Sequence, residues 1–455
     1  MGIIVGRFAT GAARKRGGAL TMKLSKKLAW ISILYFAEGL PLGIFYDVLP
    51  VYFRQQQVSL DTIGSMFFLT LPWSIKVLWS PLVDRFGRRR TWVTLCCAIM
   101  ASVTFSVPLF DASNPTLILW LLLLGLTLAS ATQDIAIDAY TIGLLSKGEE
   151  GVANGFRVAL YRVALMLGGG GTMFLVEPLG WTWIFILIAL AFVALGIIAW
   201  AAPEVPVVHK PPREWAKQFW GFLSRRGSIA VFLFIVTYKL GDLVMGPMVK
   251  PFWVDQGMTP KEIGTVSTIF GVIMSVSGAM LGGLFTTRYG IFKGLWVLGL
   301  TQALSNLGYA AVAGFGLGRP YLYSASLFES FTAGLGTAAF LAFLMRICDK
   351  DQAATQYALL SALFGLTRFF GGFSGTGAQL LGYPAFFALT FLLALPAYAL
   401  LPWVRRWVGG NGNGHGSGAP EPATPGTAAG GQGGRPQAWA TPKGGQASPA
   451  SNPAR

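Results

Sequence analysis

Two carboxylates, Asp134 and Asp138, lie four residues apart inside a long apolar run. This spacing places both on one face of a helix. Two neighbouring carboxylates in a low-dielectric setting do not both ionise freely, so one of them can hold a proton at neutral pH. We therefore predict that the pair takes part in proton coupling or contacts a substrate. The alternative is that it pairs with Arg157 and Arg162 of the next apolar run and only holds two helices together.

Other ionisable residues also lie inside apolar runs. A charged group at membrane depth costs roughly 2.5–3.5 kcal/mol on insertion scales, so such groups mark a transport pathway by default. The candidates for proton coupling are Asp134, Asp138, Glu38 and Asp242. The candidates for substrate binding are Gln133, Arg157, Arg162, Lys239, Lys76, Tyr35 and Tyr238. Arg368, Asp47 and Glu329 lie at similar depth, and for the last two solvation at a helix end is an equal alternative.

Lys239 and Asp242 are three residues apart, so they can meet on one helix. They either belong to the pathway or form a self-neutralised pair that lowers the cost of insertion. Glu38 lies beside Gly39 and Pro41, which predicts a broken or kinked helix at that point. Such breaks expose backbone groups at a binding site.

Charge is concentrated between two apolar segments in the stretch SPLVDRFGRRR at residues 80–90. Lys and Arg are retained on the cytoplasmic side of a bilayer. Charge pairs and helix termini can also latch one membrane helix to its neighbour. We predict a cytoplasmic gating loop formed by Asp84, Arg85, Gly87, Arg88, Arg89 and Arg90.

The composition is that of an integral membrane protein. The chain has 455 residues, of which 53% are hydrophobic and only 12% are charged. A soluble protein would carry about a quarter charged residues. The net charge of +16 does not indicate nucleic acid, because the cations lie between apolar runs rather than on one face with aromatics. We expect a monomer whose partners are membrane lipid, protons and a small-molecule substrate.

The cysteines and histidines give no catalytic or metal-binding pattern. Cys96 and Cys97 are adjacent in an apolar run and Cys348 lies near a helix end, while His209 and His415 fall in a linker and a tail. These positions form neither a nucleophile–histidine pair nor a set of metal ligands. We expect no enzyme activity, no cofactor and no metal site, and proton movement would have to use carboxylates.

Apolar runs of about 20 residues predict an all-α membrane protein with twelve spans. The predicted spans are 28–53, 62–82, 91–110, 116–145, 151–176, 181–202, 229–253, 262–286, 291–314, 320–347, 354–381 and 383–404. The longest internal connection divides them into two six-helix bundles, for which a central cavity near the bilayer midplane is expected. A partial internal repeat supports the division, since DTIG at 61–64 opens the second span and KEIG at 261–264 opens the eighth.

The cations predict the topology. The loops placed outside hold only Arg54, Lys250, Lys261 and Arg319, and most other cations fall on the opposite side. Both termini are therefore expected in the cytoplasm. The predicted domains are a basic extension (1–27), an N-terminal bundle (28–202), a cytoplasmic linker (203–228), a C-terminal bundle (229–404) and a disordered Gly/Pro-rich tail (405–455).

Six motifs resemble those of the AmpG-type muropeptide permeases of the major facilitator superfamily. They are FAEGLP at 36–41, KVLWSP at 76–81, QDIAIDA at 133–139, YKLGD at 238–242, GTAAF at 336–340 and ATQYALLSAL at 354–363. The charged stretch at 80–90 is similar to the loop between the second and third helices of that superfamily. Acetyl-CoA transporters are a related branch that shares part of the pattern. The resemblance implies the major facilitator fold.

The resemblance also implies a function. It indicates proton symport of anhydro-muropeptides, sugar-peptide fragments of the cell wall, across the bacterial inner (cytoplasmic) membrane for peptidoglycan recycling. Transport would proceed by alternating access. Intramembrane cations are suited to the carboxylates of that cargo, and tyrosines are suited to stacking on its sugar rings. The alternative is a carrier of the same fold for another anionic solute, such as an acetyl-CoA-like compound or a drug.

Overall fold

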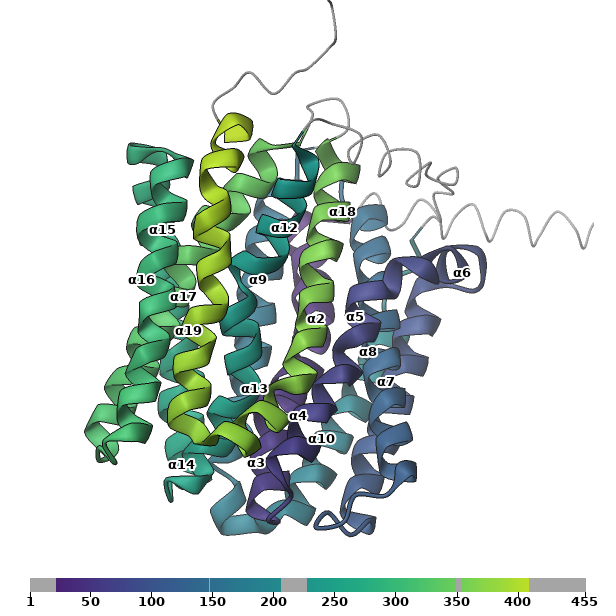
Figure 1. Cartoon of the computed structure of the whole chain (residues 1–455). Coiled ribbons are helices and arrows are strands. Elements are labelled where there is room, and N and C mark those ends of the chain that lie inside the picture. The colour runs from purple at the N-terminus through teal and green to yellow at the C-terminus, as the bar shows by residue number, and fades with distance from the viewer. Residues whose placement is uncertain (1–21, 147, 206–226, 349–352, 409–455) are drawn as a thin grey trace, which may run out of the picture. The chain divides into compact units, whose positions relative to one another are not determined.

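Helices form all of the regular secondary structure in residues 22–146, 148–205, 227–348 and 353–408, which the computed structural model describes (Figure 1). This confirms the all-α prediction. The first half of the chain forms α2 (Leu24–Gly43), η1 (Ile44–Val48), α3 (Leu49–Gln55), α4 (Leu60–Ser65), η2 (Met66–Thr70), α5 (Leu71–Ile75), η3 (Lys76–Leu78), α6 (Ser80–Arg85), α7 (Arg89–Ser106), η4 (Val107–Leu109), α8 (Leu117–Leu144), α9 (Glu150–Met166), η5 (Leu167–Gly171) and α10 (Val176–Trp200).

The second half forms α12 (Ser228–Tyr238), α13 (Leu240–Asp255), α14 (Pro260–Glu262), η6 (Ile263–Phe270), α15 (Gly271–Tyr289), α16 (Ile291–Gly314), α17 (Arg319–Arg346), α18 (Ala353–Leu366), η8 (Thr367–Phe373) and α19 (Ser374–Val408). Residues 1–21, most of the predicted linker and the tail from residue 409 lie outside the described residues. The domain boundaries therefore stay predictions. We refer to residues 24–204 as the N half and to residues 228–408 as the C half.

Eight helical stretches among the described residues are long and apolar enough to cross a membrane. One of them, at 360–405, has 46 residues, more than a single span needs. The predicted spans 62–82, 151–176 and 291–314 are helical but are not among the eight. The count of twelve spans stays a prediction.

The first helix is irregular near its middle. Pro41 lies inside α2, and the wider π turn η1 follows directly and carries Asp47. Proline removes a backbone donor from the helical ladder, and π turns of this kind are frequent at functional sites. The irregularity predicted from Gly39 and Pro41 is therefore present, and it lies on the C-terminal side of Glu38.

The C half contains a comparable interruption at Lys239. Its backbone, with φ −109° and ψ 6°, separates α12 from α13. Further along, the first turns after α14 form the eight-residue π helix η6. Interrupted helices of this type place polar and charged groups at membrane depth in transporters.

The connecting loops fall at two ends of the molecule, which serve as landmarks below. The Arg85 end contains the start of α2 and residues 85–89, 145–146, 148–149 and 201–205. The Arg54 end contains residues 54–61 and 255–262 and the first turns of α19, up to its kink at Gly382. In Figure 1, α6 lies at the upper end, and α3 and α14 lie at the lower end.

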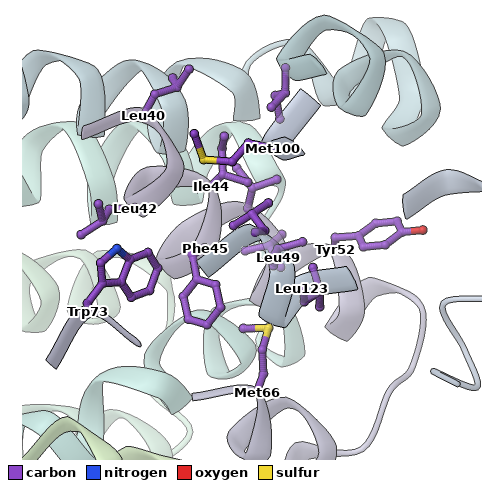
Figure 2. Packing of buried hydrophobic residues seen from close by; sticks show 14 of the residues in the cluster. Leu40, Leu42, Ile44, Phe45, Leu49, Tyr52, Met66, Trp73, Met100 and Leu123 are labelled. Atoms are coloured by element: carbon purple, nitrogen blue, oxygen red, sulfur yellow. The ribbon is translucent and has the colours of Figure 1, made fainter. Parts of the chain in front are cut away.

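The apolar core shows that the two halves pack together at the Arg54 end. The larger cluster of buried side chains joins N-half residues such as Phe45 and Trp73 with C-half residues such as Phe252 and Trp253. Figure 2 shows part of this cluster, in which the rings of Phe45 and Trp73 meet edge to face with centroids 5.4 Å apart. A second, smaller cluster consists of C-half residues alone, from Val231 to Val404.

Candidate transport site

Charged side chains of the N half meet near the middle of the helices α2, α8 and α9. Lys76 Nζ lies 3.2 Å from Asp134 Oδ2, and Arg157 Nη2 lies 3.1 Å from Asp138 Oδ1. The Tyr35 hydroxyl donates to the same oxygen of Asp138 at 2.7 Å. We call Glu38, Asp134, Asp138, Lys76 and Arg157 the central cluster.

Helix spacing explains how these residues converge. Asp134 and Asp138 are one turn apart on α8, and Tyr35 and Glu38 are one turn apart on α2. The helix α2 packs against both α8 and α9, so residues of α8 and α9 that face α2 can share one space. Arg157 of α9 reaches across, and its guanidinium carbon lies 4.7 Å from the centre of the Tyr35 ring. The predicted carboxylate pair therefore does share a face.

Two carboxyl oxygens in the central cluster have no hydrogen-bond partner. They are Glu38 Oε2 and Asp134 Oδ1, and both are buried. Glu38 lies within electrostatic reach of Asp134, Asp138, Lys76 and Arg157. A buried polar atom without a partner is unfavourable unless a proton, water or ligand satisfies it.

Three side chains of the central cluster are partly exposed. The side chains of Lys76, Asp138 and Arg157 are 32%, 36% and 41% exposed, respectively. Contact between such charges and hydrocarbon would be costly. We therefore expect their exposed parts to face water between the two halves rather than lipid.

The C half holds a smaller set of polar contacts at similar depth. Lys239 Nζ lies 3.2 Å from Asp242 Oδ2, as the spacing predicts, and also donates to the carbonyl of Ala333 at 3.4 Å. Asn306 Nδ2 donates to Asp242 Oδ1 at 3.5 Å. The charge of Lys239 is thus balanced by Asp242 in this conformation. Glu329 lies within electrostatic reach of both residues.

The other candidates for substrate binding lie apart from the central cluster. Gln133 is buried and donates to Cys97 Sγ at 3.2 Å. Tyr238 is buried in the C-half core, where its hydroxyl donates to the Leu295 carbonyl at 3.2 Å. Arg162 does not pair with Asp134 or Asp138. The alternative in which Arg157 and Arg162 pair with these two carboxylates therefore holds only for Arg157 and Asp138. Asp134 forms its ion pair with Lys76 instead.

The predicted gating loop is tied to the end of α10. Arg88 Nη1 and Arg90 Nη2 lie 2.7 and 2.8 Å from Glu204 Oε1. Gly87 has φ 74°, a left-handed conformation that glycine adopts without strain. Arg89 donates to the Val83 carbonyl within the loop. The side chain of Asp84 lies outside the described residues, and Arg85 stacks on its neighbour Phe86.

Sequence reasoning missed several ion pairs. Lys250, which the topology prediction placed in an outside loop, is buried in α13 and lies 2.9 Å from Asp47 Oδ1 of the other half. The sequence did carry a signal for this buried position, because Lys250 lies within an apolar run that contains Pro247 and Pro251. Arg54 pairs with Asp255 across the halves at 2.5 Å.

The sequence has relatives among known proteins. The sequence matches the Major Facilitator Superfamily over residues 31–371. The anhydromuropeptide permease of Escherichia coli K12 is 32% identical over 390 residues, which are 82% of this chain and 78% of that protein. A protein of Rickettsia conorii named putative transporter AmpG 4 is 30% identical over 398 residues, 82% of this chain and 95% of the relative.

Solved structures show the same fold at low sequence identity. The nucleoside transporter NupG has a TM-score of 0.66 and 14% identity, with 85% of this chain and 99% of that chain covered. An inward-facing, unoccupied bacterial homologue of the human lysosomal transporter Spinster has a TM-score of 0.65 and 14% identity, with 85% and 97% covered. The chain belongs to the major facilitator superfamily and, within it, to the AmpG-type muropeptide permease family. It is a membrane transporter.

Proposed function

We propose that this transporter imports anhydro-muropeptides into the cytoplasm for peptidoglycan recycling, coupled to protons, by alternating access. The observation that carries the proposal is the central cluster, a partly exposed set of carboxyl groups and cations at the middle of the helices. The printed name of the Escherichia coli relative supports this class of cargo.

Charge balance supports a role for protons. The central cluster holds three carboxyl groups, Glu38, Asp134 and Asp138, and two cations, Lys76 and Arg157. It is electrically neutral when one carboxyl group carries a proton, and a neutral set is far cheaper to bury. Glu38 and Asp134 are the candidates for that proton, because each has a buried oxygen without a partner. Asp242 remains a candidate in the C half.

The free cations suit an anionic cargo. Arg162 and Arg368 have no hydrogen-bond or ion-pair partner among the described residues. Arg368 of η8 in the C half lies within electrostatic reach of Tyr161 on α9 of the N half. A carboxylate between the halves could therefore bind guanidinium groups from both sides, and such charge-assisted hydrogen bonds are about twice as strong as neutral ones.

We further propose the orientation that the cations predict. The Arg85 end, with its basic start of α2 and its arginine loop, would face the cytoplasm, and both termini would lie there. The Arg54 end, where the halves share a core, would face outward. The conformation described here would then be the one that opens to the cytoplasm, in a monomer in the bacterial inner membrane.

The test is uptake of labelled anhydro-muropeptide into proteoliposomes, with and without an inward-directed proton gradient and a protonophore. Glu38→Gln, Asp134→Asn and Asp138→Asn should each reduce gradient-driven uptake at least about tenfold, the size expected for loss of one hydrogen bond to a charged group. Asp111→Asn, in an exposed loop, is the matched control and should be unchanged. Uptake that ignores the protonophore in the parent protein would refute proton coupling.

A second candidate function follows from the same cations. Guanidinium and ammonium groups recognise phosphate as well as carboxylate, so they also suit an acetyl-CoA-like solute or an anionic drug. A competition panel in the same proteoliposomes separates the two functions. Uptake of labelled anhydro-muropeptide that a CoA thioester does not inhibit supports the first proposal. Uptake of a labelled CoA thioester, without uptake of anhydro-muropeptide, supports the second.

A further inference from the structure

Three aromatic side chains, Tyr46, Trp73 and Tyr161, form a layer beside the central cluster, and we call them the aromatic layer. Trp73 comes three residues before Lys76, and Tyr161 comes four residues after Arg157. Each spacing is about one helical turn, or roughly 5 Å along the axis. The chain runs towards the Arg85 end through α5 and away from it through α9. Both aromatic residues are therefore displaced from the charged groups in the same direction, towards the Arg54 end.

Contacts within the aromatic layer hold two of its rings in place. The rings of Tyr46 and Trp73 stack, with centroids 6.2 Å apart and an angle of 25° between their planes. The Trp73 indole N–H donates to Ser130 Oγ on α8 at 3.1 Å, and Phe45 meets the indole edge to face (Figure 2). A preorganised aromatic surface loses little conformational freedom when a ligand binds to it.

Tyr161 connects the aromatic layer with the charged groups. It lies within electrostatic reach of Tyr46 and of Glu38 in the central cluster, and also of Arg368 from the C half. Close helix packing fixes its position, because a Cβ atom on Gly39 of α2 would overlap the Tyr161 carbonyl oxygen. One ligand of modest size could therefore contact both the aromatic layer and the central cluster.

The two tyrosines of the aromatic layer have unused hydrogen-bonding capacity. The Tyr46 hydroxyl is buried without a partner, and the Tyr161 hydroxyl has none among the described residues. Both side chains are partly exposed, whereas Trp73 is buried. A tyrosine joins an apolar ring to a polar tip. A pyranose matches it, because its C–H groups form apolar faces and its hydroxyl and acetamido groups lie at the rim.

Three other tyrosines of the predicted spans are unsuited to stacking on a ligand. Tyr35, Tyr140 and Tyr238 are at most 4% exposed, so their rings are enclosed by helix packing. The sugar-stacking role that the sequence suggests for tyrosines is thereby narrowed to the partly exposed Tyr46 and Tyr161.

We propose that the aromatic layer is the sugar subsite of the transport site. The inference rests on the proposed function and specifies how the cargo is oriented. The pyranose ring binds against Tyr46 and Tyr161 on the side of the Arg54 end, and the peptide carboxylates extend towards the central cluster. Trp73 is a positioning residue that supports the Tyr46 ring from behind and does not contact the sugar.

Saturation-transfer difference NMR on the full-length protein in detergent can map the two parts of the ligand. The probes are an anhydro-muropeptide and its peptide-free sugar, N-acetylglucosaminyl-anhydro-N-acetylmuramic acid. Tyr161→Leu should lower saturation transfer to the ring protons relative to the peptide protons. It should also raise the Kd of the peptide-free sugar at least about tenfold, since an aromatic contact and a hydrogen bond are lost together. Persistent peptide signals show that the variant remains folded.

Conservative variants separate the contribution of each hydroxyl from that of its ring. Tyr46→Phe and Tyr161→Phe should each raise the Kd of the peptide-free sugar about two- to tenfold, the size of one hydrogen bond. Tyr140→Phe is the matched control. The Tyr140 hydroxyl is also buried without a partner, but this residue lies within electrostatic reach of Arg90 in the arginine loop. The Kd should be unchanged in this variant.

A further pair of variants tests the positioning role of Trp73. Trp73→Leu should weaken binding of the peptide-free sugar, and Trp73→Phe, which keeps a ring beside Tyr46, should restore most of the affinity. Equal affinities in these two variants would contradict support through ring stacking. A Kd for the peptide-free sugar that none of the Tyr46 and Tyr161 variants changes would overturn the subsite, as would a parent protein that does not bind this probe.

The outcomes for the subsite and for the proposed function can be told apart. Tyrosine-dependent binding of the peptide-free sugar, in a protein that does not take up anhydro-muropeptide, would refute the proposed cargo and leave the subsite standing. Uptake of anhydro-muropeptide with an affinity for the sugar that is insensitive to both tyrosines would refute the subsite alone.

Discussion

The Tyr35 hydroxyl donates to Asp138 at 2.7 Å, although more than a hundred residues separate the two along the chain. Arg157 binds the same carboxylate oxygen and lies over the Tyr35 ring. Tyr35 therefore orients both members of the ion pair, one through its hydroxyl and one through its ring. It is 1% exposed, which suits a positioning residue better than one that touches cargo.

Truncation of Tyr35 should separate these two contributions. Tyr35→Phe removes one hydrogen bond to a charged group and should lower the free energy of unfolding by about 1.5–3 kcal/mol. Tyr35→Leu also removes the ring beneath Arg157 and should cost about 0.5–2 kcal/mol more. Thermal unfolding in detergent measures both. Equal losses in the two variants would show that the ring contributes nothing.

Lys76 and Asp134 should behave as a coupled pair. Lys76→Met alone leaves the largely buried Asp134 without its cation, and Asp134→Asn alone leaves Lys76 unbalanced. The double variant should recover stability relative to the sum of the two, with a coupling energy of about 0.5–3 kcal/mol. A double-mutant cycle by thermal unfolding gives this value. Strict additivity would mean that the two side chains do not interact.

A pH-dependent contact ties the start of α2 to the loop between α8 and α9. Lys27 Nζ donates to Glu149 Oε2 at 2.8 Å, and the Ser146 backbone N–H donates to the same oxygen at 2.8 Å. The Lys27 side chain, followed by the Ser146 backbone, lowers the pKa of Glu149 below its ordinary value. The resulting stability is present above the unfolded-state pKa and is lost as the pH falls through the lower folded-state value.

Glu149→Gln should therefore destabilise the protein at neutral pH and have little effect in acid. Melting temperatures of the parent and the variant, measured from pH 7 down to pH 3, should converge as the pH falls. Asp111→Asn serves as a comparison, because the partner of Asp111 is its near neighbour Ser113 rather than another helix. A Glu149→Gln difference that stays constant over the whole range would contradict the assignment.

The helices α15 and α17 should tolerate no added methyl group where they cross. A Cβ atom on Gly278 would overlap the carbonyl oxygen of Phe331, so Gly278→Ala forces the backbones apart. We expect a loss of about 1–3 kcal/mol, as for other overpacked sites. Gly283→Ala, on the same helix but with open space beside it, should be neutral or slightly stabilising. Thermal unfolding of the two variants provides the check.

Much of the architecture could be predicted from local patterns. Apolar runs located the helices, and the four-residue spacing of Asp134 and Asp138 placed both on one face, as the structure confirms. The Lys239–Asp242 pair followed from its spacing of three residues. Each of these predictions depends only on helix geometry, which is the same in every protein.

The partners of the charged residues could not be predicted in the same way. Lys76 rather than Arg162 reaches Asp134 because a short 3₁₀ segment, η3, sets its position. Lys250 pairs with Asp47 only because a π turn and a glycine run let two distant helices approach. These contacts depend on the arrangement of whole helices, which one sequence does not specify locally.

The shared apolar core at the Arg54 end gives the conformational change a thermal signature. Separation of residues such as Phe252 and Phe45 would expose apolar surface to water, and newly hydrated apolar surface raises the heat capacity. Hydrophobic closure weakens on cooling. The balance between the closed and open forms should therefore curve with temperature as a small unfolding equilibrium does, and cold should favour the open form.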